Sequence, residues 1–392
     1  MSPIRRRIAL LSLAAGNFSV GLSAFVVIGI LPLLSADLNI TPAQAGLYVT
    51  VYALTYAVAS PLLVSMSGNL KRKSLLVGSL AVIAIAAVLA ATATTPDVLF
   101  VARFLAAIGG GIFTPVTAAV AYSLGGPEQR GTALATVFIG LQLAQAAGVP
   151  IGVFLALMLG WPAAFWMVLA VTLTALIGLL FNLDDQPTRQ TSSFAILLVA
   201  MRDRLGMAFV LITGLHVAAM SIVYAFLALL ALASDASIGL TMTLFGIGGI
   251  LNSVMVGFLI PRYGLKRVRL VMLSGQIFLL PLLSFPVVGL PVLPPEAFYL
   301  IVWAWAAMAV GFMVPQQILL MERRPEQGTT LISLNATSNY LGISIGSAIG
   351  GFVITHAGQY WLGIAGGAMA VITMFGAVRA ERLWSRRSLG DH

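Results

Sequence analysis

The sequence predicts an all-α membrane protein with twelve transmembrane helices in two pseudo-symmetric halves of six. Composition, the spacing of the apolar runs and an internal repeat each point to this fold. Of the 392 residues, 60% are hydrophobic and 8% are charged, with a mean hydropathy of +1.03. Soluble domains are about half apolar and a quarter charged, so water is not the main solvent of this chain.

The apolar runs have the length of membrane spans, since a bilayer core about 30 Å thick needs roughly 20 apolar residues per helix. In order along the chain, we expect spans at residues 8–34, 44–67, 74–93, 97–123, 131–158, 161–182, 206–233, 238–260, 269–289, 297–320, 329–355 and 359–379. A loop is expected at Gly125, between the fourth and fifth spans. Little of the chain remains for a soluble domain.

The amino end carries Arg5, Arg6 and Arg7 before an apolar stretch at residues 8–34. This stretch is too long for a signal peptide, so we expect it to be the first span. Between the sixth and seventh spans, a polar segment is followed by a short apolar run at residues 194–201, which is expected to lie along the interface as a helix. The predicted organisation is a first half at 1–183, a linker at 184–205 and a second half at 206–392.

The basic residues predict the orientation. If the amino end is cytoplasmic, the opposite side of the membrane has no Lys or Arg outside the spans, and Arg103 lies within the fourth span. This distribution satisfies the positive-inside rule with both termini in the cytoplasm, in a cytoplasmic (inner) membrane. The net charge of +9 is then explained by topology, and no nucleic-acid partner is expected. The cytoplasmic basic residues are Arg5 to Arg7, Lys71 to Lys73, Arg130, Arg189, Arg202, Arg204, Arg262, Lys266, Arg267, Arg269, Arg323, Arg324 and those from Arg379 to Arg387.

The two halves share a repeat. The tripeptide Pro127-Glu128-Gln129 recurs as Pro325-Glu326-Gln327, about 198 residues later. At the same offset, Gly148, Ile151, Gly152, Phe154 and Gly160 match Gly346, Ile349, Gly350, Phe352 and Gly358. Parallel repeats of this kind are typical of secondary transporters.

Several local motifs resemble one family. They are Gly29-Ile30-Leu31-Pro32, Ala36-Asp37-Leu38, Ala45-Gly46-Leu47, Tyr52-Ala53-Leu54, Pro61-Leu62-Leu63, Ala102-Arg103-Phe104, Gly140-Leu141, Gly148-Val149-Pro150-Ile151-Gly152 and Gly160-Trp161. The chain resembles arabinose-efflux-like permeases in the drug:proton antiporter branch of the major facilitator superfamily, closely in the first half and loosely in the second.

The resemblance implies efflux by alternating access, with proton antiport and a part in multidrug resistance. It also implies a conformational motif made of Gly148, Pro150 and Gly152 in the fifth span, with loop residues Lys71, Arg72, Arg262 and Gly264. Glycines let two helices approach closely, and proline bends a helix whose neighbours satisfy the freed backbone groups. The alternative interpretation of the fifth span is ordinary packing of small residues.

The chain departs from the family pattern at acidic positions. Ala24 stands where many relatives carry a Glu, and Pro261 where the loop acid would stand. The acids fall in loops or near predicted helix ends, with Asp37, Asp97, Asp235 and Glu296 outside and the others inside. With no carboxylate expected at mid-membrane, permanent cations are weaker candidate solutes than neutral or anionic ones.

Two residues could carry proton coupling. His216 lies in the seventh span, and imidazole alone has an unperturbed pKa, about 6.5, near working pH. Arg103 cannot deprotonate, but it could hold an anion or set the state of a neighbour. The alternatives are a hydrogen-bonded histidine within the bundle and an arginine tied to backbone carbonyls.

Helical spacing selects candidate substrate contacts. Tyr48, Tyr52 and Tyr56 share a face of the second helix, and His216 and Tyr224 share one of the seventh. The amide pairs Gln142 with Gln145 and Asn335 with Asn339 lie on the fifth and eleventh helices. These groups suit sugars, nucleosides or drug-like solutes in a cavity expected at the bilayer middle. The alternative is that the amides hold helices together.

Other functions remain as alternatives. An uncoupled facilitator, a substrate-specific importer and a non-transporting membrane sensor or scaffold all fit the composition. No HExxH, GxSxG or phosphate-binding Gly-rich loop with Lys occurs, so neither an enzyme nor an ATP-driven pump is expected. We expect no cofactor and no metal. The expected partners are a small-molecule substrate, protons and the lipid bilayer, around a monomer.

Overall fold

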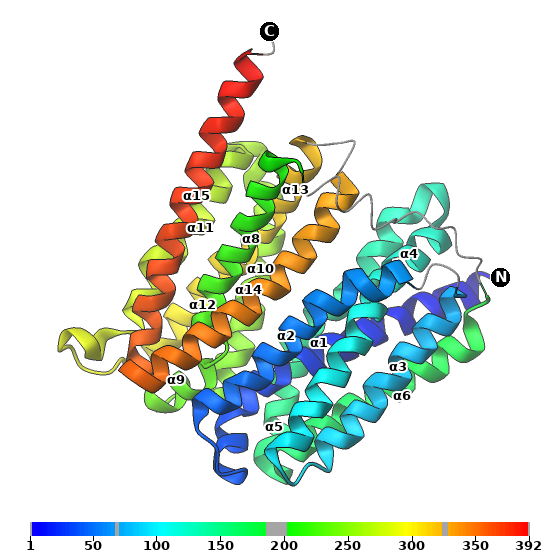
Figure 1. Cartoon of the computed structure of the whole chain (residues 1–392), viewed down its shortest axis with the longest axis horizontal. Coiled ribbons are helices and arrows are strands. Elements are labelled where there is room, and N and C mark those ends of the chain that lie inside the picture. Colours follow the sequence, from blue (N-terminus) through cyan, green and yellow to red (C-terminus); the bar gives the residue numbers. More distant parts are fainter. Residues whose placement is uncertain (1, 67–69, 186–201, 324–327, 391–392) are drawn as a thin grey trace. The chain divides into compact units, whose positions relative to one another are not determined.

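The computed structural model describes residues 2–66, 70–185, 202–323 and 328–390, and helix is the only regular secondary structure in them. This confirms the predicted all-α fold class. The chain divides into two compact units, residues 1–191 and 192–392 (Figure 1). The predicted interfacial helix at residues 194–201 lies outside the described residues.

Unit 1 contains the helices of the first half. They are α1 (Pro3–Asp37), α2 (Pro42–Met66), α3 (Arg72–Ala91), α4 (Pro96–Leu143), the π-helix η1 (Ala144–Gly148), α5 (Val149–Leu159) and α6 (Pro162–Asn182). Several begin with proline, whose missing N–H costs nothing in the first turn.

The residues around Gly125, where a loop was expected, are helical and belong to α4. One candidate span, Pro96–Gly125, lies within α4, and the next, Gln129–Leu159, begins in α4 and continues through η1 and α5. At Gly125 the backbone folds back tightly, since a Cβ there would lie 2.8 Å from the Cα of Arg130. The chain thus reverses at Gly125 as predicted, but in helical conformation and without an irregular loop. A glycine, which has no Cβ, allows this close approach.

Unit 2 contains the helices of the second half. They are α8 (Arg204–Tyr224), α9 (Leu227–Ala233), α10 (Ile238–Tyr263), α11 (Leu265–Leu282), η2 (Phe285–Val288), α12 (Pro295–Gly311), α13 (Met313–Arg323), α14 (Gly328–Ala357), η3 (Gln359–Trp361) and α15 (Leu362–Gly390). Helices α8 and α9 together form one candidate span, as do α12 and most of α13.

Within the described part of the chain, eleven helical segments are long and apolar enough to cross a membrane. The expected ninth span corresponds to α11, which begins before Arg269 and carries Lys266, Arg267 and Arg269 in its first turns. It therefore begins earlier and ends earlier than the predicted 269–289. Gly264, with φ of +83°, separates α10 from α11 in a conformation that favours glycine.

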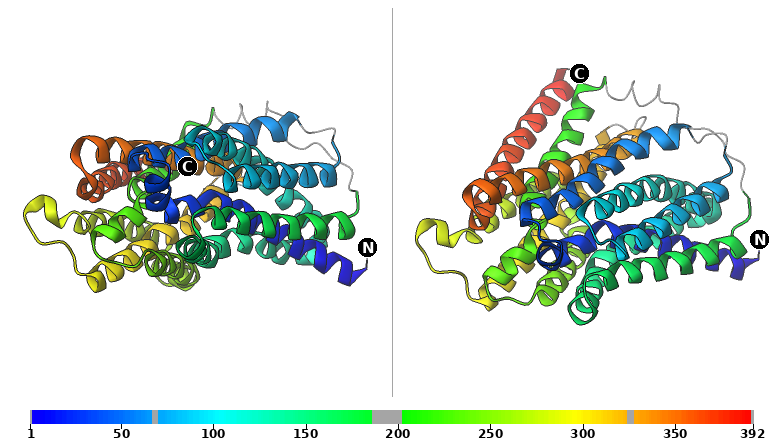
Figure 2. Two further views of the ribbon diagram at one scale, coloured as in Figure 1. Left: turned by 90° about the horizontal axis from the view of Figure 1, so that it is seen from below. Right: turned by 60° about the horizontal axis from the view of Figure 1, so that its bottom comes forward.

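The matched glycines of the repeat pack in matched places. A Cβ on Gly152 would lie 2.6 Å from Cγ2 of Val26 on α1, and a Cβ on Gly350 would lie 2.7 Å from the carbonyl oxygen of Ile222 on α8. In each unit, the fifth span thus closely approaches the first span. Figure 2 shows the helices of each unit running alongside one another. This agrees with the pseudo-symmetric halves that the sequence predicts.

Candidate functional site

Arg103 is a buried cation of unit 1, with 1% of its surface exposed. From α4, its Nε donates to the carbonyl of Tyr48 on α2 at 3.4 Å, and its Nη2 donates to the carbonyl of Ala24 on α1 at 3.2 Å. Its Nη1 donates to the carbonyl of Ser23. The guanidinium also lies over the Tyr52 ring, 4.4 Å from its centroid. One planar group therefore ties three helices together through backbone carbonyls.

The tyrosine face of α2 is turned into unit 1. Tyr48, Tyr52 and Tyr56 are buried, and the hydroxyl of Tyr48 donates to the carbonyl of Pro96 at 3.3 Å. The hydroxyl of Tyr52 donates to the carbonyl of Val20 at 3.4 Å. These two hydroxyls are therefore already engaged by backbone groups of the same unit.

The fifth span contains a local widening of the helix. Gln142 is exposed at the end of α4, while Gln145 is half-buried inside the π-helix Ala144–Gly148. Pro150 follows directly, and a Cβ on Gly148 would lie 2.8 Å from Cζ of Phe18. Single-turn π-helices inside α-helices are frequent at functional sites. The two glutamines therefore have different surroundings despite sharing a predicted face.

His216 lies in the interior of unit 2 with 1% of its surface exposed. Its Nε2 is 2.8 Å from the carbonyl oxygen of Ala309 on α12, and its Nδ1 is 2.8 Å from Nε2 of Gln276 on α11. Tyr224, two turns later on α8, stacks on Phe245 with ring centroids 4.3 Å apart. The structure thus bonds the histidine to groups of α11 and α12 and stacks the tyrosine on α10.

The asparagines of α14 differ in burial. Asn335 is buried, and its Oδ1 has no hydrogen-bond partner among the described residues, whereas Asn339 is half-buried. A buried carbonyl oxygen without a donor costs roughly 1–3 kcal/mol. Asn335 is therefore the predicted contact with an open hydrogen-bonding position.

Sequence reasoning missed a buried ion pair in unit 2. Nη2 of Arg269 on α11 and Oε1 of Glu381 on α15 lie 2.9 Å apart, and their side chains are 0% and 2% exposed. Nη1 of Arg269 also donates to Oε1 of Gln316 on α13 at 2.9 Å. Arg269 was expected at the cytoplasmic start of the ninth span and Glu381 beyond the end of the twelfth. Because α11 starts earlier and α15 ends later than predicted, both lie inside the helical bundle.

The loop residues of the conformational motif are less enclosed. Lys71 is exposed, and its Nζ lies 2.7 Å from Oδ2 of Asp185, whose hydrogen bond and charge raise the pKa of the lysine. Nη1 of Arg72 donates to the carbonyl of Ala119 on α4 at 3.2 Å. Arg262 is exposed, with its guanidinium 5.5 Å from the Tyr263 ring.

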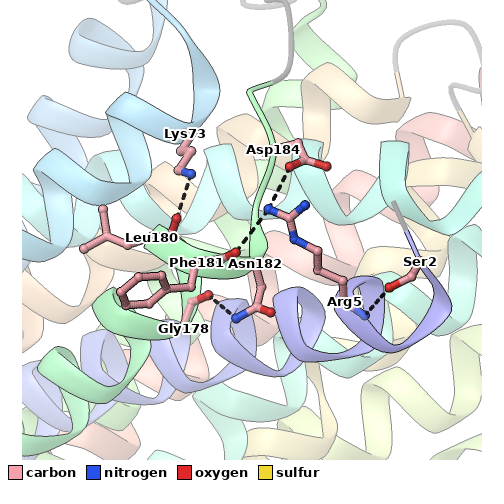
Figure 3. Close-up of polar contacts among 8 residues, drawn as sticks. All are labelled: Ser2, Arg5, Lys73, Gly178, Leu180, Phe181, Asn182 and Asp184. Atoms are coloured by element: carbon pink, nitrogen blue, oxygen red, sulfur yellow. Dashed lines mark hydrogen bonds and ion pairs between the residues drawn. The ribbon is translucent and has the colours of Figure 1, made fainter.

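Cations also cover the carboxyl end of α6 (Figure 3). Arg5 on α1 donates to the carbonyl of Phe181 at 3.1 Å and pairs with Asp184 at 3.0 Å, while Lys73 on α3 donates to the carbonyl of Leu180 at 2.8 Å. The last carbonyls of a helix lack partners within it and carry partial negative charge, so basic side chains suit this position. These contacts join α1, α3 and α6 at one end of unit 1.

Comparisons with known proteins agree with this architecture. The family model described as Major Facilitator Superfamily matches residues 13–285. The chain is 27% identical to the uncharacterized MFS-type transporter YbcL of Bacillus subtilis over 92% of this chain and 93% of that one. It is 26% identical to the inner membrane transport protein YdhP of Escherichia coli K12, over 95% and 96% of the two chains. The solved structure of the nucleoside transporter NupG matches with a TM-score of 0.73 at 16% identity, covering 96% of this chain and 99% of that one.

Proposed function

Since the chain belongs to the Major Facilitator Superfamily and is therefore a membrane transporter rather than an enzyme, we propose that it exports small neutral or amphiphilic solutes by proton-coupled antiport. The proposed solutes are sugars, nucleosides or drug-like molecules. Transport proceeds by alternating access, as in other transporters built from parallel repeats.

The proposed solute class is based on the charged residues that are buried in the structure. Among the described side chains, the buried charged groups are Arg103, Arg269 and Glu381. Glu381 is already bonded to Arg269, and Arg103 is held by backbone carbonyls. The buried carboxylate described here is already paired with a guanidinium, so a permanent cation would find no free counter-ion among these groups. Neutral solutes are therefore favoured.

Asn335 supports a polar contact with the solute. Its open Oδ1 can accept a hydrogen bond from a hydroxyl or amide of the substrate. Gln142, Gln145 and Asn339 are further candidates, because the structure does not bury them completely. The hydroxyls of Tyr48 and Tyr52 are engaged elsewhere, so their contribution would come from their rings.

The direction of transport is proposed from the fifth span. Gly148, Pro150 and Gly152 follow a pattern that marks exporters in the family that the chain resembles, and the π-helix next to them adds a local irregularity. Lys and Arg gather at the predicted inner ends of the spans, which supports cytoplasmic termini in an inner membrane. We propose that the transporter acts as a monomer.

Proton coupling is assigned to His216. Arg103 stays charged at physiological pH, and its donors hold α1 and α2, which makes it a positioning residue. Imidazole is the side chain whose unperturbed pKa, about 6.5, lies nearest to neutral pH. A specific observation also favours an uncoupled facilitator as the second candidate. Ala24, which stands where many members of the family that the chain resembles carry a Glu, accepts from Arg103 with its backbone carbonyl and has no carboxylate to offer it.

The test is counterflow in proteoliposomes with a panel of sugars, nucleosides and neutral and cationic drugs, with and without an imposed pH gradient. The proposal expects gradient-dependent accumulation of at least one neutral solute. Transport that does not depend on the pH gradient would favour the facilitator. Accumulation in the direction opposite to export would favour an importer. A preference for lipophilic cations would contradict the proposed solute class, and no transport of any solute would favour a sensor or scaffold.

A further inference from the structure

The hydrogen bonds of His216 define its protonation state in this structure. A carbonyl can only accept, so the Nε2 facing Ala309 carries the hydrogen. The amide nitrogen of Gln276 donates, so the Nδ1 facing it carries a lone pair. The ring is therefore a neutral imidazole of one tautomer, which this network assigns.

The amide of Gln276 has a second orientation available. Gln276 is 1% exposed, and its Oε1 has no hydrogen-bond partner among the described residues. Turning the amide over would bring Oε1 to the position that Nε2 now occupies. Oε1 accepts only, so in that orientation it requires a hydrogen on Nδ1 of His216.

The same three groups can thus satisfy both protonation states. With the amide turned over, the imidazolium would donate from Nδ1 to Gln276 and from Nε2 to Ala309. In each orientation one end of the amide is bonded to the ring and the other end is not, so the exchange loses no hydrogen bond. A buried polar group normally has one fitting set of partners, whereas this histidine has two.

The neighbouring ring favours the charged form as well. Phe312 stacks on His216 with centroids 4.0 Å apart and planes 27° apart, and it is completely buried. The face of an aromatic ring attracts a cation through its quadrupole. Phe312 would therefore offset part of the cost of placing a charge in the interior of unit 2.

Other ionisable groups are distant or paired. Helices α11, α13, α14 and α15 pack against α8, and α12 meets it through the carbonyl of Ala309. The buried charged residues described on these helices are Arg269 and Glu381, whose opposite charges largely cancel. Arg269 precedes Gln276 by seven residues, about 10 Å along the helix. The remaining titratable groups described on these helices and on α8 are exposed or half-buried, except for the stacked Tyr224: Arg204, Lys266, Arg267, Glu296, Tyr299, Tyr340, His356, Arg379 and Arg382.

We propose that His216 and Gln276 form a proton-binding switch inside unit 2. A hydronium ion gives a proton to the lone pair of Nδ1, so an N–H bond forms, an O–H bond breaks and water leaves. The hydrogen bond from the Gln276 amide nitrogen to Nδ1 is lost, and the amide turns over so that its Oε1 accepts the new N–H. The event reorganises the contact between α8 and α11 while the bond to α12 persists. As the coupling site of an antiporter, the switch rests on the proposed function; as a proton-binding site, it can be tested without transport.

The experiment is a pH titration of full-length protein in liposomes, with ¹⁵N-labelled histidine and glutamine, followed by solid-state NMR. The sequence contains three histidines, so the double variant His356→Gln, His392→Gln leaves His216 as the single imidazole. At alkaline pH we expect the hydrogen on Nε2 alone. On acidification, Nδ1 gains a hydrogen, and the Gln276 side-chain amide, assigned by its loss in Gln276→Met, shifts with the same midpoint.

A substitution at Gln276 sharpens the test. In Gln276→Glu, a carboxylate beside Nδ1 should move the His216 midpoint to higher pH by about one to three pH units. A ring that stays neutral at every pH at which the protein is folded would overturn the switch, as would protonation without a change at Gln276. A titrating His216 in a protein whose transport ignores pH would refute the coupling proposal and leave the switch intact.

Discussion

Arg269 and Glu381 form an ion pair 2.9 Å long whose two side chains are almost completely removed from solvent. Gln316 extends the pair, because its Oε1 accepts from Arg269 and its Nε2 donates to the carbonyl of Phe209 at 2.7 Å. The network therefore connects α11, α15, α13 and α8. An opposite charge nearby offsets much of the cost of burying each ion.

The first prediction concerns the stability of this pair. Arg269→Met or Glu381→Met alone leaves one uncompensated buried charge and should destabilise the protein by about 3–5 kcal/mol. The double substitution removes both charges and should recover most of that loss. Thermal unfolding of the purified protein in detergent measures whether the double variant is more stable than either single variant. Arg379→Met, at an exposed position on α15, is the control.

A double variant as unstable as the single variants would contradict this account. It would mean that the side chains contribute through packing or through Gln316, and that their charges do not depend on each other.

The second prediction concerns the close approach of α5 and α1. A side chain at Gly152 would begin 2.6 Å from Cγ2 of Val26, so Gly152→Val should destabilise the protein by about 1–3 kcal/mol. Gly78→Ala on α3, where a Cβ meets nothing within 4 Å, should be neutral or stabilising by up to about 1 kcal/mol. The same unfolding assay compares them. Equal effects at both sites would show that packing at Gly152 is loose.

The third prediction concerns the shape of the Arg103 cation. Lysine keeps the charge but cannot present the planar fork that reaches carbonyls of two helices. Arg103→Lys should therefore lose stability by roughly 1.5–3 kcal/mol for each charged hydrogen bond that is not replaced. Arg7→Lys, at an exposed position on α1, should change nothing. Wild-type stability in Arg103→Lys would mean that charge alone is required.

The fourth prediction separates substrate binding from helix packing at Asn335. Leucine has a similar volume and removes the buried acceptor, so Asn335→Leu should retain or increase stability. If Oδ1 binds the solute, the KM for transport should rise about tenfold, the equivalent of one hydrogen bond worth about 1.4 kcal/mol. Loss of stability with an unchanged KM would instead identify Asn335 as a residue that holds helices together.

The fold could be predicted from the sequence because the thickness of the bilayer constrains the length of each span, and because the apolar composition indicates that lipid surrounds the chain. The sites could be predicted less well. Periodicity placed Tyr48 and Tyr52 on one face of α2, but it could not show that their hydroxyls reach Pro96 and Val20. Likewise, Gln276 lies on a different helix from His216, and no spacing along the chain connects them.

The buried ion pair was missed for a related reason. Arg269 and Glu381 lie close to the ends of their spans, where basic and acidic residues usually reach water. Two charges 112 positions apart reveal no pairing by their spacing. A sequence signal did exist, since the predicted ninth span already began at Arg269, and apolar residues follow it directly.

The measurement that tests the central claim most directly is solute-driven proton movement in proteoliposomes containing a pH-sensitive dye. The wild type and His356→Gln, an exposed histidine on α14, should both couple solute flux to proton flux. His216→Gln should keep solute counterflow and lose the proton signal. Unchanged proton coupling in His216→Gln would contradict the account, and so would the absence of any proton movement in the wild type during solute transport.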